Sequence, residues 1–375
     1  MKRLFQFRFI LLIFVIFRSI DFLISYFATQ IIPYLGFFPL KRDLYLYNLP
    51  HIISSFANFD GVHYILIAKY GYSMYEQAFF PLYPILIRLI SFLGQNEVLS
   101  GLLISNLSFL VALYFIPKLL KEIKIPDDKI VWIILFLLVF PTSFFFNSLY
   151  TESLFLMFFV LSLYFYIKEK YLLALVFSFF ISLTKLMGVF ISGVFIFIKK
   201  EKLTIRFTPI LAPILGLLIY SFYLFRTTGD PFFFINSQPF FGGNRSTSLV
   251  FFPQVIYRYV KILNTKDFNF QYFIASIELT LFVVILITLI FFSYYSIKQK
   301  NKVLTGINLF SLINLIIPTL TGTFQSVPRY VLISFGFFIA LSYIKNNFIK
   351  ALIVLIFIIF HVILLSFFSQ GYFIS

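Results

Sequence analysis

The sequence of 375 residues contains no cysteine, which excludes a disulfide framework, a thiolate nucleophile and a sulfur-ligated metal. Its three histidines, His51, His63 and His361, are too few to fill a zinc site alone. The chain also lacks a P-loop, a Rossmann glycine fingerprint, a nucleophile elbow and a zinc-binding motif. Nucleotide hydrolysis, hydride transfer and serine chemistry therefore have no support in the sequence.

Charge is also scarce, because charged residues make up only 12% of the chain and hydrophobic residues make up 61%. An ordinary soluble globule could not bury so large an apolar share. Apolar runs of roughly 17 to 25 residues recur from end to end, the length that an α-helix needs to cross about 30 Å of hydrocarbon. The runs do not alternate as the strands of a membrane barrel do. The composition predicts an all-α polytopic membrane protein.

The basic residues indicate membrane orientation. The 30 Lys and Arg residues lie in short clusters between the apolar runs, which argues against nucleic-acid binding despite the net charge of +16. About eleven spans fit the roughly 20-residue criterion, at 8–30, 98–117, 130–147, 152–167, 171–184, 187–198, 207–225, 272–296, 303–320, 329–345 and 349–368. The clusters, among them Lys2 with Arg3 and Lys199 through Arg206, then share one side. The positive-inside rule makes that side cytoplasmic.

Two stretches decide this count. The segment 79–93 is apolar but short, contains two prolines and carries Arg88 in its middle. If it crossed, the basic cluster that begins at Lys118 would lie outside, so an amphipathic helix in the outer interface is expected instead. The segment 171–198 is expected to form a hairpin of two short helices, because a single span would invert the charge bias downstream.

The remaining chain offers no separate soluble domain, so residues 1–375 are expected to form one integral membrane domain. The run 8–30 carries Arg18 and Asp21, is too long for the core of a signal peptide and lacks a small-residue cleavage site, so it is expected to be retained as a span. Two outer loops are long, at 31–97 and 226–271, and long ordered loops usually carry function.

This map sends a set of polar and aromatic residues to the outer face. The candidates for a shared polar cavity there are Asp60, His63, Glu76, Gln77, Tyr150, Glu152, Lys185, Gln238, Arg245, Arg329 and Tyr330. Ionisable groups near span ends are costly, so a common cavity explains them better than chance placement. If residues after Asn58 are helical, Asp60, His63 and Tyr64 share one helix face, where a carboxylate could act as a general base.

Each of these residues also has a purely structural interpretation. Asp60 could be a helix N-cap, since Asp is a preferred capping residue, or a salt-bridge partner, and Glu152 in a first helical turn after Thr151 would complement the helix dipole. Lys185 and Arg329 at outer span ends suit an anionic phosphate, but each could simply extend toward lipid headgroups. The aromatic run that follows Gly229 could stack on a sugar or belong to the interfacial aromatic belt. These alternatives stay open on the residues alone.

Several segments, in order, resemble the GPI mannosyltransferase 2 family, also called PIG-V, and its prokaryotic relatives. The matching pieces are FDGVHYILIAKYGY from Phe59, EQAFFPLYPIL from Glu76, FPTSFFFNSLYTESLF from Phe140, SLTKLMG from Ser182, GDPFFFINSQ from Gly229 and SVPRYVL from Ser326. They span most of the chain, and the first three carry most of the specificity. The sequence departs from the family pattern at three places. The family often has Trp where Phe59 stands, Arg where Lys185 stands, and a Trp after the Gln at 238, where Phe240 and Phe241 occur here.

The resemblance implies a GT-C type glycosyltransferase that moves a sugar, expected to be mannose, from a polyprenyl or dolichyl phosphate to a glycan or glycolipid acceptor on the extracytoplasmic face. It places the expected acid in the first outer loop, at Asp60, as the base of an inverting transfer. No cofactor is required, because a phosphate is already a fair leaving group; a divalent ion held by Asp60 and Glu152 is an alternative that is not predicted.

The expected partners are the lipid-phosphate sugar donor, the acceptor and membrane lipids, without nucleic acid, and the expected location is a prokaryotic plasma membrane with the site facing outside. The main rival is a flippase or transporter of lipid-linked saccharides, which needs access from both sides of the membrane. Polar residues gathered at one face favour catalysis over transport.

Overall fold

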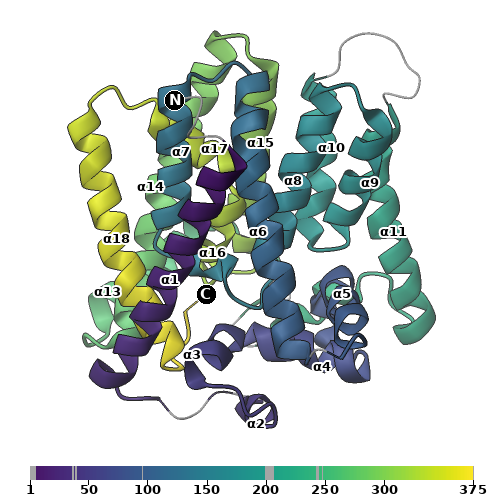
Figure 1. Ribbon diagram of the computed structural model, residues 1–375, viewed down its shortest axis with the longest axis vertical. Coiled ribbons are helices and arrows are strands. Elements are labelled where there is room, and N and C mark those ends of the chain that lie inside the picture. Colours follow the sequence, from purple (N-terminus) through teal and green to yellow (C-terminus); the bar gives the residue numbers. More distant parts are fainter. Residues whose placement is uncertain are drawn as a thin grey trace.

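The computed structural model describes residues 6–35, 38, 40–94, 96–198, 207–241, 245–246 and 248–374, and in these residues it is helical throughout (Figure 1). The described residues contain no β-strand; a single β-bridge joins Val250 to Thr321. The basic residues Lys2, Arg3 and those from Lys199 to Arg206 lie outside the described residues. The helical fold class is confirmed.

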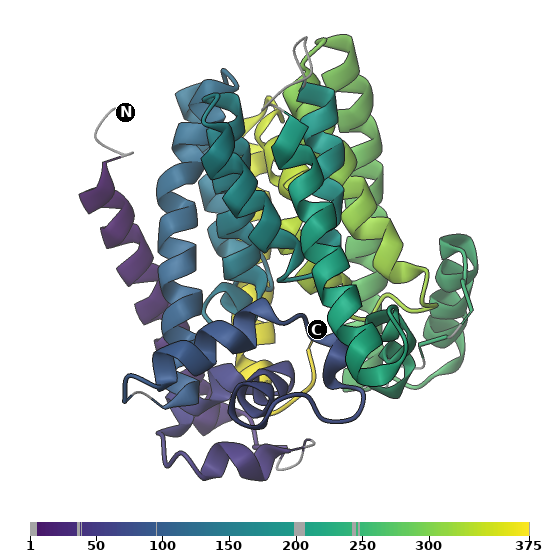
Figure 2. The ribbon, with the colours of Figure 1, turned by 90° about the vertical axis from the view of Figure 1, so that its right-hand side faces the viewer.

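The bundle is built from long and medium helices that run side by side (Figures 1 and 2). They are α1 (Phe7–Ile31), α6 (Glu97–Glu122), α7 (Asp127–Val139), α8 (Glu152–Ile167), α9 (Tyr171–Ser182), α10 (Ile191–Ile198), α11 (Thr208–Thr228), α14 (Phe270–Lys298), α15 (Lys302–Thr319), α17 (Phe335–Ser342) and α18 (Asn347–Ser369). Within the described residues, five of them, α6, α11, α14, α15 and α18, are long and apolar enough to cross a membrane.

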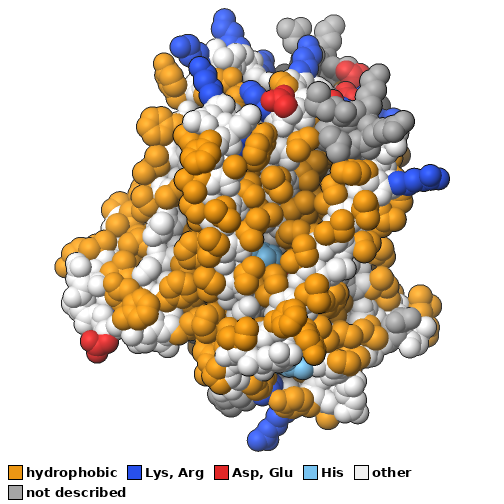
Figure 3. All heavy atoms as spheres, turned by 60° about the vertical axis from the view of Figure 1, so that its left-hand side comes forward, with side chains coloured by type: hydrophobic (Ala, Val, Ile, Leu, Met, Phe, Trp, Pro, Cys, Tyr) orange, Lys and Arg blue, Asp and Glu red, His pale blue; other side chains and the backbone are white. Residues whose placement is uncertain are grey.

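These helices suit a lipid environment, because their apolar side chains point outward as well as inward. In α14 only 22% of the most apolar window is buried inside the protein, and in α18 only 28%. Figure 3 shows hydrophobic side chains covering the middle of this face, while most of the visible Lys and Arg side chains project from the upper end. Helix α8 differs, because its residues from Glu152 to Leu163 are almost all buried. A helix that is apolar and buried all round forms the centre of a bundle.

The first long loop folds into short helices at the lower end of the bundle (Figure 1). They are α2 (Lys41–Tyr45), α3 (His51–Ser54), η2 (Ser55–Ala57), α4 (Asp60–Tyr70), η3 (Glu76–Ala78) and α5 (Leu82–Ser91). The second long loop adds α12 (Phe233–Asn236), η7 (Gln238–Phe241) and the amphipathic α13 (Phe252–Thr265). The described residues of both loops contain helices; such helices were expected only in the first loop. The short, amphipathic α5 falls on the segment 79–93 and packs against α4 and α6.

Two of the expected spans are not continuous helices. Helix α7 ends at Val139, eight residues before the predicted end of span 130–147, because Pro141 cannot continue a helix, and only the 3₁₀ turn η4 (Ser143–Phe146) follows. The expected span 329–345 is divided into α16 (Val327–Tyr330), η8 (Val331–Ile333) and α17. The segment 171–198 does form two short helices, joined through η5 (Leu186–Phe190).

Candidate functional site

Four ionisable side chains from distant parts of the chain form one ion-pair cluster. Asp60 Oδ2 accepts a hydrogen bond of 2.5 Å from Arg329 Nη1. Arg329 Nε lies 3.4 Å from Glu152 Oε1, and the Lys185 ammonium donates to the same Glu152 oxygen. Glu152 is fully buried, while the side chains of Arg329, Lys185 and Asp60 are 11%, 17% and 28% exposed. The two carboxylates and two cations balance formally, which is what burial of charge requires.

Asp60 is held at the start of α4 by its neighbours rather than by capping. The N-cap position is Phe59, whose backbone adopts φ 59°, and no side chain caps the helix. The N-cap interpretation of Asp60 is therefore wrong, and the salt-bridge interpretation is confirmed, since its carboxylate pairs with Arg329. Tyr150 Oη donates 2.9 Å to the carbonyl of Asn58, and the Asn58 amide donates 3.0 Å to the carbonyl of Phe368 at the end of α18. These bonds fix the turn that presents Asp60.

Glu152 occupies the first turn of α8, as its sequence position predicted. The N-cap Thr151 makes no side-chain capping bond, and Glu152 directs Oε1 to two cations instead. Its Oε2 atom is buried without a hydrogen-bond partner in the structure. An anion at this helix N-terminus is favourable, but the two cations account for its orientation.

The two cationic residues of the cluster lie in irregular backbone or in a very short helix. Lys185 stands in extended conformation between α9 and η5. Arg329 lies in the one-turn helix α16, which starts after Ser326 in a left-handed conformation with φ 72°. The Arg329 guanidinium lies 5.2 Å from the ring centre of Tyr150 and 5.7 Å from that of Phe145. Aromatic faces beneath a guanidinium restrict its rotation and attract its charge.

A second polar pair flanks this cluster. His63 Nδ1 lies 3.0 Å from Glu76 Oε1, and Glu76 Oε2 accepts a 3.0 Å bond from the backbone of Ser73. The His63 ring stacks on Phe79 at 5.0 Å. His63 follows Asp60 by one helical turn on α4, so the shared helix face that the spacing predicted is present.

Burial alone would raise the pKa of both outer carboxyl groups, but hydrogen bonds and positive charge outweigh it. The Arg329 guanidinium, with smaller contributions from His63 and Arg245, holds the pKa of Asp60 below its ordinary value. The hydrogen bonds from His63 and Ser73 likewise hold the pKa of Glu76 below its ordinary value. Both groups are therefore carboxylates at neutral pH.

The remaining candidates fall into a looser arrangement. Arg245 Nη1 donates 2.5 Å to Gln238 Oε1, so these two contact each other in the second loop. Tyr330 lies beside both cations, with its ring centre 6.0 Å from the Lys185 ammonium and 6.0 Å from the Arg329 guanidinium. Gln77 is buried, its Oε1 has no hydrogen-bond partner among the described residues, and its backbone carbonyl accepts a bond from Tyr220. No described contact brings Gln77 into the ion-pair cluster.

The sequence did not single out Asn58, Phe145 or Ser326, which position the cluster. A conformational signal does mark the site: Phe59, Tyr75 and Ser326 are non-glycine residues with positive φ, and each lies within three residues before a candidate of the site. Such backbone costs about 1–3 kcal/mol and collects at functional sites. The five other non-glycine residues with positive φ in the described chain do not border candidates.

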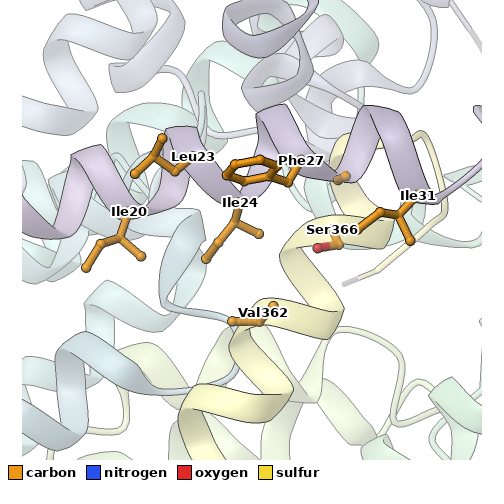
Figure 4. A pocket seen from close by; sticks show the side chains of 8 residues that line it. Ile20, Leu23, Ile24, Phe27, Ile31, Val362 and Ser366 are labelled. Atoms are coloured by element: carbon orange, nitrogen blue, oxygen red, sulfur yellow. The ribbon is translucent and has the colours of Figure 1, made fainter.

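An apolar groove of about 240 Å³ lies away from these residues, between α1 and α18 (Figure 4). It is lined by Ile20, Leu23, Ile24, Phe27, Ala28, Ile31, Val362 and Ser366. In the ion-pair cluster, by contrast, acids and bases contact one another directly. A ligand that is to bind Arg329 in place of Asp60 must therefore displace that carboxylate. Among the described residues, no group of three or more His, Asp or Glu side chains could hold a metal ion.

Comparison of the chain with family models, curated proteins and solved structures finds no match.

Proposed function

We propose that the protein is a membrane glycosyltransferase that moves a sugar from a polyprenyl phosphate to a hydroxyl of a glycan or glycolipid. The observation that carries the proposal is the ion-pair cluster, in which Asp60 at the start of α4 pairs with Arg329, while Glu152 at the start of α8 pairs with both Lys185 and Arg329. This reaction needs a base for the acceptor and cations for the departing phosphate.

In this mechanism the acceptor hydroxyl attacks the anomeric carbon and gives its proton to Asp60. The bond between that carbon and the phosphate oxygen breaks, and the lipid phosphate leaves with the electron pair. Arg329 and Lys185 stabilise the charge that grows on the phosphate, because preorganised cations shielded from water act strongly on developing charge. Arg245 lies close enough for its charge to act on Asp60, so it is available to the same phosphate.

The resting pair has to open for this reaction to proceed. Asp60 bound to Arg329 is a weak base, since the guanidinium lowers the pKa of Asp60. A donor phosphate offers Arg329 another anion and so releases the Asp60 carboxylate toward the acceptor. Binding of the donor thereby activates the base, and Glu152 keeps Lys185 and Arg329 in place during the exchange.

The membrane setting follows the charge pattern. We propose about eleven spans, a GT-C type architecture and a prokaryotic plasma membrane in which the end with α2 to α5 faces outside. The similarity of several segments to the PIG-V family supports mannose as the sugar. The basic residues between the spans support the orientation, since the cytoplasmic side collects Lys and Arg.

The test is sugar transfer by purified protein in lipid nanodiscs, with polyprenyl-phosphate mannose and a mixture of glycan acceptors. Wild type should form product, and Asp60→Asn should lose at least about 100-fold in rate, the usual contribution of a general base. Product formation by Asp60→Asn at the wild-type rate would remove Asp60 from the mechanism. Movement of the donor across a vesicle membrane without transfer would favour the flippase instead.

A further inference from the structure

A second buried charge network lies inside the bundle, away from the ion-pair cluster. Arg18 Nη1 lies 3.2 Å from Asp21 Oδ2 on α1, and Asp21 Oδ1 lies 2.9 Å from His361 Nε2 on α18. His361 Nδ1 in turn lies 3.1 Å from Ser143 Oγ in η4. Asp21 is fully buried, and Arg18, His361 and Ser143 are at most 6% exposed.

Burial of these charged groups costs free energy, which argues that the network has a role. Arg18 and Asp21 lie near the middle of α1, and charged groups at membrane depth are costly even when paired. The guanidinium lies 5.2 Å from the ring centre of Phe14 and 4.9 Å from that of Phe109. Well-packed apolar residues could fill the same volume at no loss of stability, so pairing alone does not explain these charges.

The donor and acceptor roles of Ser143 show how the network is connected. The Ser143 hydroxyl donates 2.5 Å to the carbonyl of Leu138, so toward His361 it can only accept. His361 Nδ1 is therefore placed to donate to Ser143, while Nε2 lies 2.9 Å from Asp21 Oδ1. The result is a directed chain from Asp21 through the imidazole to the backbone segment that follows α7.

This segment leads to the ion-pair cluster. Next to Ser143, Thr142 Oγ1 donates 2.6 Å to the carbonyl of Pro328, the residue before Arg329. Two residues beyond Ser143, the Phe145 ring lies under the Arg329 guanidinium. The segment has no α-helix of its own, so its position depends on bonds from its side chains and its packing.

We infer that Asp21 and His361 are positioning residues that hold η4 and thereby set the place of Arg329. They touch no substrate; they act through Ser143, Thr142 and Phe145. The value of this role to catalysis rests on the proposed function, in which Arg329 binds the donor phosphate. The mechanical part, that the network restrains the α16 segment, stands on the contacts alone.

The absence of cysteine from the chain allows a clean probe. A nitroxide attached to Gln325→Cys reports the mobility of the segment that carries Arg329, and binding of polyprenyl phosphate to nanodiscs reports the site. Asp21→Asn and His361→Leu are compared with His361→Gln, which retains a hydrogen-bonding amide. Ser192→Ala is the matched control, because it removes a buried bond of 2.6 Å between α10 and Ile210 of α11, outside this network.

We expect greater nitroxide mobility and about tenfold weaker binding of polyprenyl phosphate in Asp21→Asn and His361→Leu, the loss that follows one hydrogen bond in a charged network. His361→Gln should recover part of both, and Ser192→Ala should change neither. Lower thermal stability with unchanged mobility and affinity would overturn the inference, leaving only a structural role. Increased mobility in a protein whose wild type neither binds the lipid phosphate nor transfers sugar would uphold the restraint and reject the proposed function.

Discussion

The proposed exchange of anions on Arg329 makes a prediction that runs against simple intuition: removing the proposed base, Asp60, should tighten donor binding. In the resting protein Asp60 occupies Arg329 through a bond of 2.5 Å, and the phosphate must displace it. A hydrogen bond to a charged group contributes about 1.5–3 kcal/mol. The Asp60 side chain is only 28% exposed, so water screens this bond weakly. Since 1.4 kcal/mol is about tenfold in affinity, Asp60→Asn should bind polyprenyl phosphate roughly 10- to 100-fold more tightly.

The assay is equilibrium binding of polyprenyl phosphate to protein in nanodiscs, combined with sugar transfer on the same preparations. Asp230→Asn is the matched control, because Asp230 carries the same charge in the second outer loop, where it bonds to Asn236 and the backbone of Phe232. Asp60→Asn should combine tighter binding with lost transfer, and Asp230→Asn should alter neither by more than about twofold. Equal or weaker binding by Asp60→Asn would refute the exchange, because Arg329 would then not be shared between carboxylate and phosphate.

Three further predictions concern the acids of the site. Glu152→Gln should lower the free energy of unfolding by about 3–5 kcal/mol, since it leaves two largely buried cations short of one counter-charge. Thermal unfolding measures this loss. Glu278→Gln is the control and should lower the stability less, because the described partner of Glu278 is the hydroxyl of Tyr259. The lowered pKa of Asp60 means that its pairing stabilises the fold above the unfolded pKa of about 3.9 and is lost as pH falls through the folded value. The stability difference between wild type and Asp60→Asn should therefore stay constant from pH 7 to about 5 and shrink only below about pH 4; a change near pH 6 would contradict the assignment. Glu76→Gln should lower transfer about tenfold, because it weakens the bond that holds His63 one helical turn from Asp60. Donor affinity should stay unchanged, since among the described residues neither Lys185 nor Arg329 pairs with Glu76; a large loss of donor affinity would contradict this separation of Glu76 from the phosphate site.

The helical fold was predictable because it depends on local properties of the sequence. Apolar runs of sufficient length have few options in lipid, so their positions follow from composition. The errors have equally local causes. The predicted span 130–147 includes Pro141, where the apolar run continues but the α-helix cannot. The predicted span 329–345 covers parts of three separate helical segments, since hydropathy does not report changes of backbone geometry.

The meeting of Asp60 with Arg329 was predictable only in part. The assignment of Asp60 to the first outer loop and of Arg329 to an outer span end predicted a common face, yet the bond joins residues 269 positions apart, and no local pattern encodes such a pairing. The N-cap error at Asp60 has the same origin, because capping preference is local while the Arg329 contact is not. The contact between Asp21 and His361 was not predictable for the same reason, since 340 positions separate the two residues.

The backbone around the ion-pair cluster explains why local rules fail there. Phe59 and Ser326 adopt positive φ values that bulky or branched chains avoid, and each begins a short helix that carries a residue of the cluster. Strain of about 1–3 kcal/mol at each position persists only if surrounding contacts impose it. Those contacts are the bond from Tyr150 to Asn58 on one side and the bond from Thr142 to Pro328 on the other. A fold selected for stability alone would relax these turns; one that must hold a carboxylate against a guanidinium, ready to exchange it for phosphate, has reason to keep them.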